Sequence, residues 1–177
     1  MSESELSRPI KIRALPADPI VIEASEAERA ALAERFSLTS VDDLHATIEL
    51  ERRAKAIRAS GTLKAHITQA CAISHEDFAT RIEEQLAFRF VEESAPESSD
   101  ADEIEIELTT DDLDEIEYAG ETFDLGEAVA QSLGLAIDPY AEGPNADAVR
   151  TDKGITSDED EASSGPLADA LRALKKD

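Results

Sequence analysis

Three stretches of this chain alternate apolar and polar residues over lengths that only extended strands accommodate. From position 44 to 51 the even positions are apolar and the odd ones carry histidine, threonine or glutamate, and positions 63 to 68 repeat the alternation. A period of two residues is that of a strand with one buried face. The third stretch places Ile82, Glu84, Leu86, Phe88 and Phe90 on one side. Three such strands in succession predict an antiparallel meander.

The turns of this meander are expected at two places. Ser60-Gly61 is a turn dipeptide and predicts the tip of the first hairpin, although strands of this length could equally hold a bulge near Arg53. Residues 74–77, Ser-His-Glu-Asp, predict the second turn. After the third strand, residues 92–102 are expected to form a mobile loop, and the alternating run 103–108 predicts a further strand.

Two short strands and a helix are expected before the meander. Residues 9–13 and 20–23 have the pattern of short strands. Ser25 followed three positions later by Glu28 is a capping box, which predicts a helix that runs to about Phe36.

A second helix is expected after the meander. The dipeptide Ala119-Gly120 predicts a small hairpin between residues 116–118 and 121–123. Asp124 is a suitable N-cap for the apolar helix that follows, and Asp138-Pro139 ends this helix just before Tyr140.

These elements predict an α+β fold with a curved antiparallel sheet, either a meander or a partly open barrel, and one or two packed helices. Residues 1–140 are expected to form this core domain. Residues 141–165 have almost no large apolar side chain and predict a disordered acidic linker. Residues 166–177 predict a short C-terminal helix with Pro166 in its first turn.

The formal net charge of −24 is concentrated in one part of the chain. Residues 90–149 contain 19 acidic residues and no lysine or arginine, whereas residues 1–89 contain 15 acidic and 12 basic residues. Such a charge repels a polyanion at long range. The single cysteine and the absence of a signal-peptide or membrane-span pattern lead us to expect a cytoplasmic protein that does not bind a membrane.

A basic segment stands out against this background. No acidic residue occurs from position 52 to 75, and five basic side chains cluster about the expected hairpin. They either balance carboxylates on neighbouring strands or contact a phosphate backbone locally. The predicted binding residues are Arg52, Arg53, Lys55, Arg58 and Lys64.

We find no pattern typical of an enzyme or of a cofactor site. Cys71 has His66 and His75 within five positions, but zinc needs four ligands and the chain has no second cysteine. A glycine-rich phosphate loop, a Gly-x-Ser-x-Gly elbow and a His-Glu-x-x-His helix are all absent. We therefore expect no catalysis, no metal and no cofactor.

The order of several segments resembles the YceD family, whose members are linked to accumulation of large-subunit ribosomal RNA. The resemblance is carried by ITQACAISHEDFATRIEEQLAFRF, by the helix entry Phe123-Asp124-Leu125, by GLAIDPY and by the closing GPLADALRALKKD. Many members carry Cys-x-x-Cys at the first of these and further cysteines near the C-terminus. Here Cys71-Ala72-Ile73-Ser74 keeps only the first cysteine.

The resemblance implies a non-catalytic ribosome-assembly factor that supports accumulation or processing of large-subunit rRNA. Its partner is expected to be that rRNA, a basic ribosomal protein, or both, and the oligomeric state is left open. The alternative is an acidic chaperone or adaptor for a basic protein unrelated to rRNA. Asp124, Pro139 and Tyr140 complete the predicted binding residues, since they stand at the two ends of the helix within the acidic segment.

Overall fold

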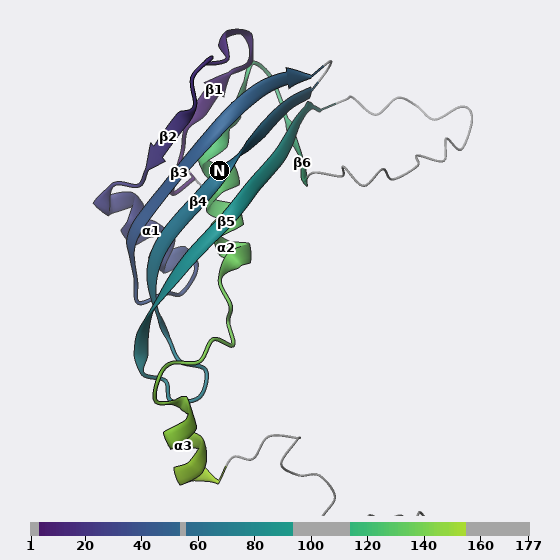
Figure 1. Cartoon of the computed structure of the whole chain (residues 1–177). Coiled ribbons are helices and arrows are strands. Elements are labelled where there is room, and N and C mark those ends of the chain that lie inside the picture. The colour runs from purple at the N-terminus through teal and green to yellow at the C-terminus, as the bar shows by residue number, and fades with distance from the viewer. Residues whose placement is uncertain (1–3, 54–55, 94–113, 155–177) are drawn as a thin grey trace, which may run out of the picture. The chain divides into compact units, whose positions relative to one another are not determined.

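The structure, a computed structural model, describes residues 4–53, 56–93 and 114–154. Its main feature is a five-stranded sheet in the order β2-β3-β4-β5-β6 (Figure 1). The strands are β2 (Ile20–Glu23), β3 (Ser40–Arg53), β4 (Ala56–Ala70), β5 (Asp77–Glu92) and β6 (Asp114–Tyr118). The sheet is mainly antiparallel and open, because its order ends at β2 and β6 without returning to the first strand. The predicted α+β class is therefore confirmed.

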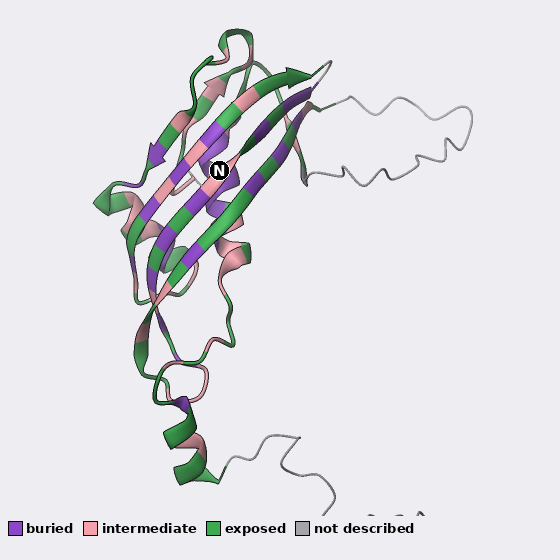
Figure 2. Ribbon diagram, in the orientation of Figure 1, coloured by how far each residue is buried: buried purple, intermediate pink, exposed green. Residues whose placement is uncertain are grey.

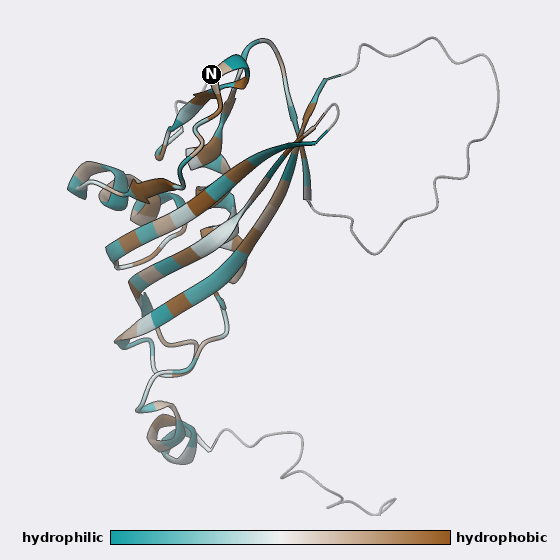
Figure 3. Ribbon diagram, turned by 45° about the horizontal axis from the view of Figure 1, so that its top comes forward, coloured by the Kyte–Doolittle hydropathy of each residue, from teal (hydrophilic) through white to brown (hydrophobic). Residues whose placement is uncertain are grey.

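The alternation in the sequence corresponds to alternating burial along the three long strands (Figure 2). Leu44, Ala46 and Ile48 of β3 are buried, and Leu63 and Ala65 of β4 lie opposite Ala46 and Leu44. The intervening side chains form a polar face, so hydrophilic and hydrophobic bands alternate along each strand (Figure 3). One face of the sheet thus belongs to the core and the other to solvent.

The hairpin turn predicted at Ser60-Gly61 is wrong. β3 ends at Arg53, β4 begins at Ala56, and both residues of the dipeptide pair with β3 inside the ladder. Gly61 is needed for a different reason, since a Cβ atom there would lie 2.0 Å from the carbonyl oxygen of Thr47. The dipeptide therefore marks a close backbone approach in a strand, which is the other common use of glycine in a sheet.

The small hairpin predicted about Ala119-Gly120 is also wrong. The chain does turn there, and Gly120 has a φ of 84°. The flanking strands, however, go to different sheets: β6 pairs in parallel with β5, whereas β7 (Thr122–Asp124) pairs with β1 (Pro9–Lys11). Long-range partners thus replace the local pairing that the dipeptide favours.

Both predicted helices are present. α1 (Glu26–Arg35) begins at the capping box of Ser25 and Glu28. α2 (Leu125–Ala136) begins at Asp124, whose carboxylate accepts from the amides of Gly126 and Glu127. Five side chains of α2 are buried in the core, and the ring of Phe123 stacks on Phe90 with centroids 4.1 Å apart. Those five are Leu125, Ala128, Val129, Ala130 and Leu133.

The N-terminal strap, residues 4–8, fixes the start of α2. Leu6 is fully buried, and the amide of Arg8 and the hydroxyl of Ser7 donate to the carboxylate of Asp124. The strap runs so close to α2 that a Cβ atom on Gly126 would lie 2.4 Å from the carbonyl oxygen of Leu6. Glycine is therefore required at this position of the helix.

The chain divides into two compact units, one of residues 1–69 and 79–138 and one of residues 70–78 and 139–177. In the described part of the second unit, the amide of Ala72 donates to the carbonyl of Ala141. This unit also contains α3 (Ala146–Lys153), which lies inside the segment that the sequence predicts to be a disordered linker. For residues 146–153 that prediction is wrong.

The pattern of α3 explains why sequence reasoning missed it. Only Ala146 is buried, and the arginine of this helix, Arg150, is held by Glu142 and Asp147 rather than by apolar packing. Residues 155–165 of the predicted linker and the predicted helix over 166–177 lie outside the described residues, as do the predicted strand over 103–108 and most of the predicted loop over 92–102. The three-part division of the chain stays a prediction.

We predict that Gly126→Ala destabilises the protein more than Gly134→Ala, although both substitutions favour the helix intrinsically. The added methyl at 126 meets backbone of the strap, whereas at 134 it meets the Phe36 ring, which can move. We expect Gly126→Ala to cost about 2 kcal/mol in urea unfolding. Equal stability of the two variants would contradict this packing.

We predict that stability falls with acid because of two ion pairs. The hydrogen bond from Arg8 lowers the pKa of Glu28 to about 2, and that from Arg35 lowers the pKa of Glu127 to about 2, from 4.5. A lowered folded-state pKa contributes stability above pH 4.5 that is lost as pH falls towards 2. In the double variant Glu28→Gln with Glu127→Gln, the urea unfolding midpoint should depend less on pH over that range. Glu34→Gln, on an exposed glutamate of α1, should leave the pH dependence of the midpoint unchanged.

Candidate functional site

Three of the basic residues predicted to bind a partner, Arg52, Arg53 and Arg58, lie near the connected end of the β3-β4 hairpin. Arg53 ends β3 and forms an ion pair with Glu51, with Nη2 and Oε1 2.9 Å apart. Lys64, farther along β4, forms an ion pair with Glu83 of β5 at 3.0 Å. Lys55 lies outside the described residues. Two of these cations are thus neutralised by carboxylates on the same or an adjacent strand.

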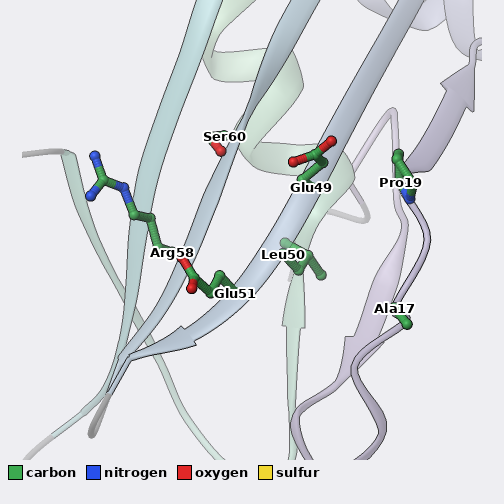
Figure 4. A pocket seen from close by; sticks show the side chains of 7 residues that line it. All are labelled: Ala17, Pro19, Glu49, Leu50, Glu51, Arg58 and Ser60. Carbon is green, nitrogen blue, oxygen red and sulfur yellow. The ribbon is translucent and has the colours of Figure 1, made fainter.

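Arg58 borders an open cavity of about 640 Å³ (Figure 4). It lies opposite Glu51 in the β3-β4 register, and Glu49 lies opposite Ser60. Ala17 and Pro19, before β2, form the other wall. The lining therefore carries two carboxylates and one guanidinium, which does not make a positive pocket.

Arg52 has a structural contact. Its guanidinium donates to the backbone carbonyl of Ile12 in the short 3-10 helix Ile12–Ala14. This bond ties the end of β3 to the segment that follows β1. Arg52 therefore positions a loop, and its charge is partly engaged by the protein itself.

The remaining predicted binding residues are not joined to this cluster. The carboxylate of Asp124 is hydrogen-bonded to the first amides of α2 and to the strap. No hydrogen bond or ion pair of the described residues links it to the basic side chains of the hairpin. Pro139 and Tyr140 belong to the second unit, where the Tyr140 side chain is 80% exposed.

The thiol of Cys71 is held in its turn by backbone hydrogen bonds. The buried sulfur accepts from the amides of Ile73 and Ser74 at 3.4 and 3.3 Å. Hydrogen bonding by Ser74, aided by the backbone of Gly143 and Ile73, lowers the pKa of the Cys71 thiol to about 7. Among the described residues no three His, Cys, Asp or Glu side chains are arranged to share a metal ion.

Sequence reasoning missed a second cavity, between β5 and α2. It measures about 190 Å³ and is lined by Glu84, Gln85, Leu86, Ser132, Leu135 and Ala136. Leu135 is 83% exposed although it belongs to the apolar helix. The available signal was Glu84, a charge within the apolar row of β5.

The fold and these sites define an α+β protein with an open sheet, a mixed-charge polar face and an excess of carboxylates. No helix in the described parts of the chain has the length and apolar character needed to cross a membrane.

The family is shown directly by comparison of the sequence with family models. Residues 59–175 match the model described as large ribosomal RNA subunit accumulation protein YceD, and the chain belongs to this family. The predicted membership is thereby confirmed. No curated protein and no solved structure gave a match.

We predict that no metal copurifies with the protein. Cys71 and three histidines are the only thiol and imidazole groups in the chain, and zinc sites use four ligands. Elemental analysis of protein prepared without a metal-affinity tag should find no stoichiometric zinc, and Cys71→Ser should fold with or without a chelator. Loss of the folded state of the wild-type protein on chelation would overturn this expectation.

Proposed function

We propose that this protein supports accumulation of large-subunit ribosomal RNA without catalysis, by binding a basic protein component of the assembling subunit through its carboxylates. The family supplies the process, since it is described as a large ribosomal RNA subunit accumulation protein. The distribution of charge supports the kind of partner.

The observation that carries the proposal is the contrast between most of the basic residues near the hairpin and the carboxylates at the joined ends of β5 and β6. Arg53 and Lys64 have carboxylate partners and Arg52 is bonded to backbone, so that Arg58 alone of the described candidates has no such contact. In contrast, Glu92 and Glu117, near the joined ends of β5 and β6, have no side-chain partner among the described residues. A local excess of free carboxylates attracts a basic partner within a Debye length of about 8 Å.

Direct contact with rRNA is the second candidate. It is favoured by the exposure of Arg53 and Arg58 at the end of the hairpin. Phosphate contacts need such cations, but the ion pair of Arg53 with Glu51 reduces the gain from binding at that residue. An adaptor for a basic protein unrelated to rRNA is a further alternative that the same acidic surface would serve.

Purification of the tagged protein from its own cells tests the proposal. RNA sequencing and mass spectrometry are applied to the same eluate, before and after nuclease treatment. A basic large-subunit protein that stays bound after nuclease treatment, and dissociates as salt rises, supports the proposal. Recovery of rRNA alone, lost with nuclease, would favour direct RNA contact, and a basic protein from outside the ribosome would favour the adaptor.

We predict that reversing three arginines, Arg52→Glu with Arg53→Glu and Arg58→Glu, lowers stability modestly and leaves function intact. The loss should be about 1 kcal/mol, the sum of small exposed contacts. Thermal unfolding and complementation of large-subunit rRNA levels measure the two effects. A stable triple variant that fails to restore the rRNA would instead place the hairpin end in the binding site.

A further inference from the structure

Among the described residues, no strand covers the edge of β5 along most of its length. β6 pairs with β5 only from Phe88 to Glu92, and no other described strand lies on that side of residues 79–87. Figure 1 shows β5 continuing well past the end of β6. At about 3.3 Å per residue, this leaves about 30 Å of strand whose outward amides and carbonyls lack a strand partner.

The cavity between β5 and α2 described above lies beside this edge, on the core side of the sheet, and we call it the groove. Leu86 of β5 and Leu135 and Ala136 of α2 supply its apolar wall. A strand added to β5 would place alternate side chains on this face, where one of them could cover Leu135. Backbone pairing and an apolar pocket together are the two elements of recognition by strand addition.

Glu84 determines which strand can be added. It points to the same face as Leu86, is exposed, and has no hydrogen bond or ion pair within the described residues. An inward-facing charge on an edge strand blocks association with apolar strands. A lysine or arginine opposite Glu84 turns this block into an attractive cross-strand pair.

From this edge, groove and charge we propose that residues 79–87 of β5 bind an extended segment of a basic protein as an added strand. The segment places a basic side chain opposite Glu84 and an apolar one, two residues away, against Leu86 and Leu135. A second copy of this chain fits poorly, because each copy carries a net charge of −24 and brings its own Glu84. The inference rests on the proposed function for the basic character of the partner and names the site that holds it.

The test uses the full chain and a labelled synthetic peptide that alternates threonine with valine and lysine, so that valine and lysine share one face. Fluorescence anisotropy measures affinity, and amide hydrogen exchange measures protection at residues 79–87. The same peptide with alternate amides N-methylated keeps the charge but cannot pair. Binding of the first peptide alone, with slowed exchange in β5, is expected.

Two pairs of variants separate the edge from general electrostatics. Glu84→Lys is matched by Glu34→Lys on an exposed position of α1, and Leu135→Ser is matched by Val21→Ser on β2, the opposite edge of the sheet. Glu84→Lys and Leu135→Ser should each weaken binding roughly tenfold, and the matched variants should change it less than twofold. Glu84→Gln replaces Glu84→Lys if the reversal lowers the melting temperature.

Three results would overturn the inference. The N-methylated peptide could bind as tightly as its parent, or the two members of each variant pair could weaken binding equally. Light scattering could also show a wild-type dimer that Glu84→Lys dissociates, which would make a second copy the occupant. If the tagged protein still retains a basic large-subunit protein in the Glu84→Lys variant, the proposed function survives and only the edge is excluded.

Discussion

The carboxylate of Asp124 is the contact on which the arrangement of the first unit depends. It accepts four hydrogen bonds, from the amides of Gly126, Glu127 and Arg8 and from the hydroxyl of Ser7. One side chain thereby starts α2, ends β7 and holds the N-terminal strap. Because Arg8 continues to Glu28 of α1, both helices are linked to the same segment. Charge-assisted hydrogen bonds of this kind are stronger than neutral ones, so a single carboxylate can hold together the place where β7, α2 and the strap meet.

The described carboxylates fall into two groups, according to whether they have a hydrogen-bonded partner within the protein. Those with a defined bonded geometry, such as Glu28 and Glu127, stabilise the fold and are unavailable to a partner. Those on strand ends and edges, such as Glu84 and Glu117, have no such partner within the described residues. The net charge of the chain therefore does not give the number of carboxylates available for binding. Only the carboxylates without an internal partner can bind a basic protein.

The sequence predicted what depends on local pattern and not what depends on partners distant in the chain. The alternation of the long strands, the capping box at Ser25 and the cap at Asp124 follow from periodicity and side-chain chemistry, and these were predicted correctly, although the bounds of β3 and β4 were not. Gly61 and Gly120 were both assigned to hairpins, although one meets the neighbouring strand and the other connects two sheets. The cluster of basic residues was likewise apparent in the sequence. The ion pair of Lys64 with Glu83 could not be predicted, because it depends on the register of β4 against β5.

The two edges of the main sheet differ in a way that bears on binding. β2 is short, so its edge offers little backbone to another chain, and short edge strands are a common protection against pairing. β5 is long, and within the described parts of the chain it is protected only at its end, by β6, and by one inward charge at Glu84. A single charge excludes apolar strands without excluding all strands, because an opposite charge reverses its effect. Protection of this kind is selective, and selectivity for basic segments is what the proposed function requires of this edge.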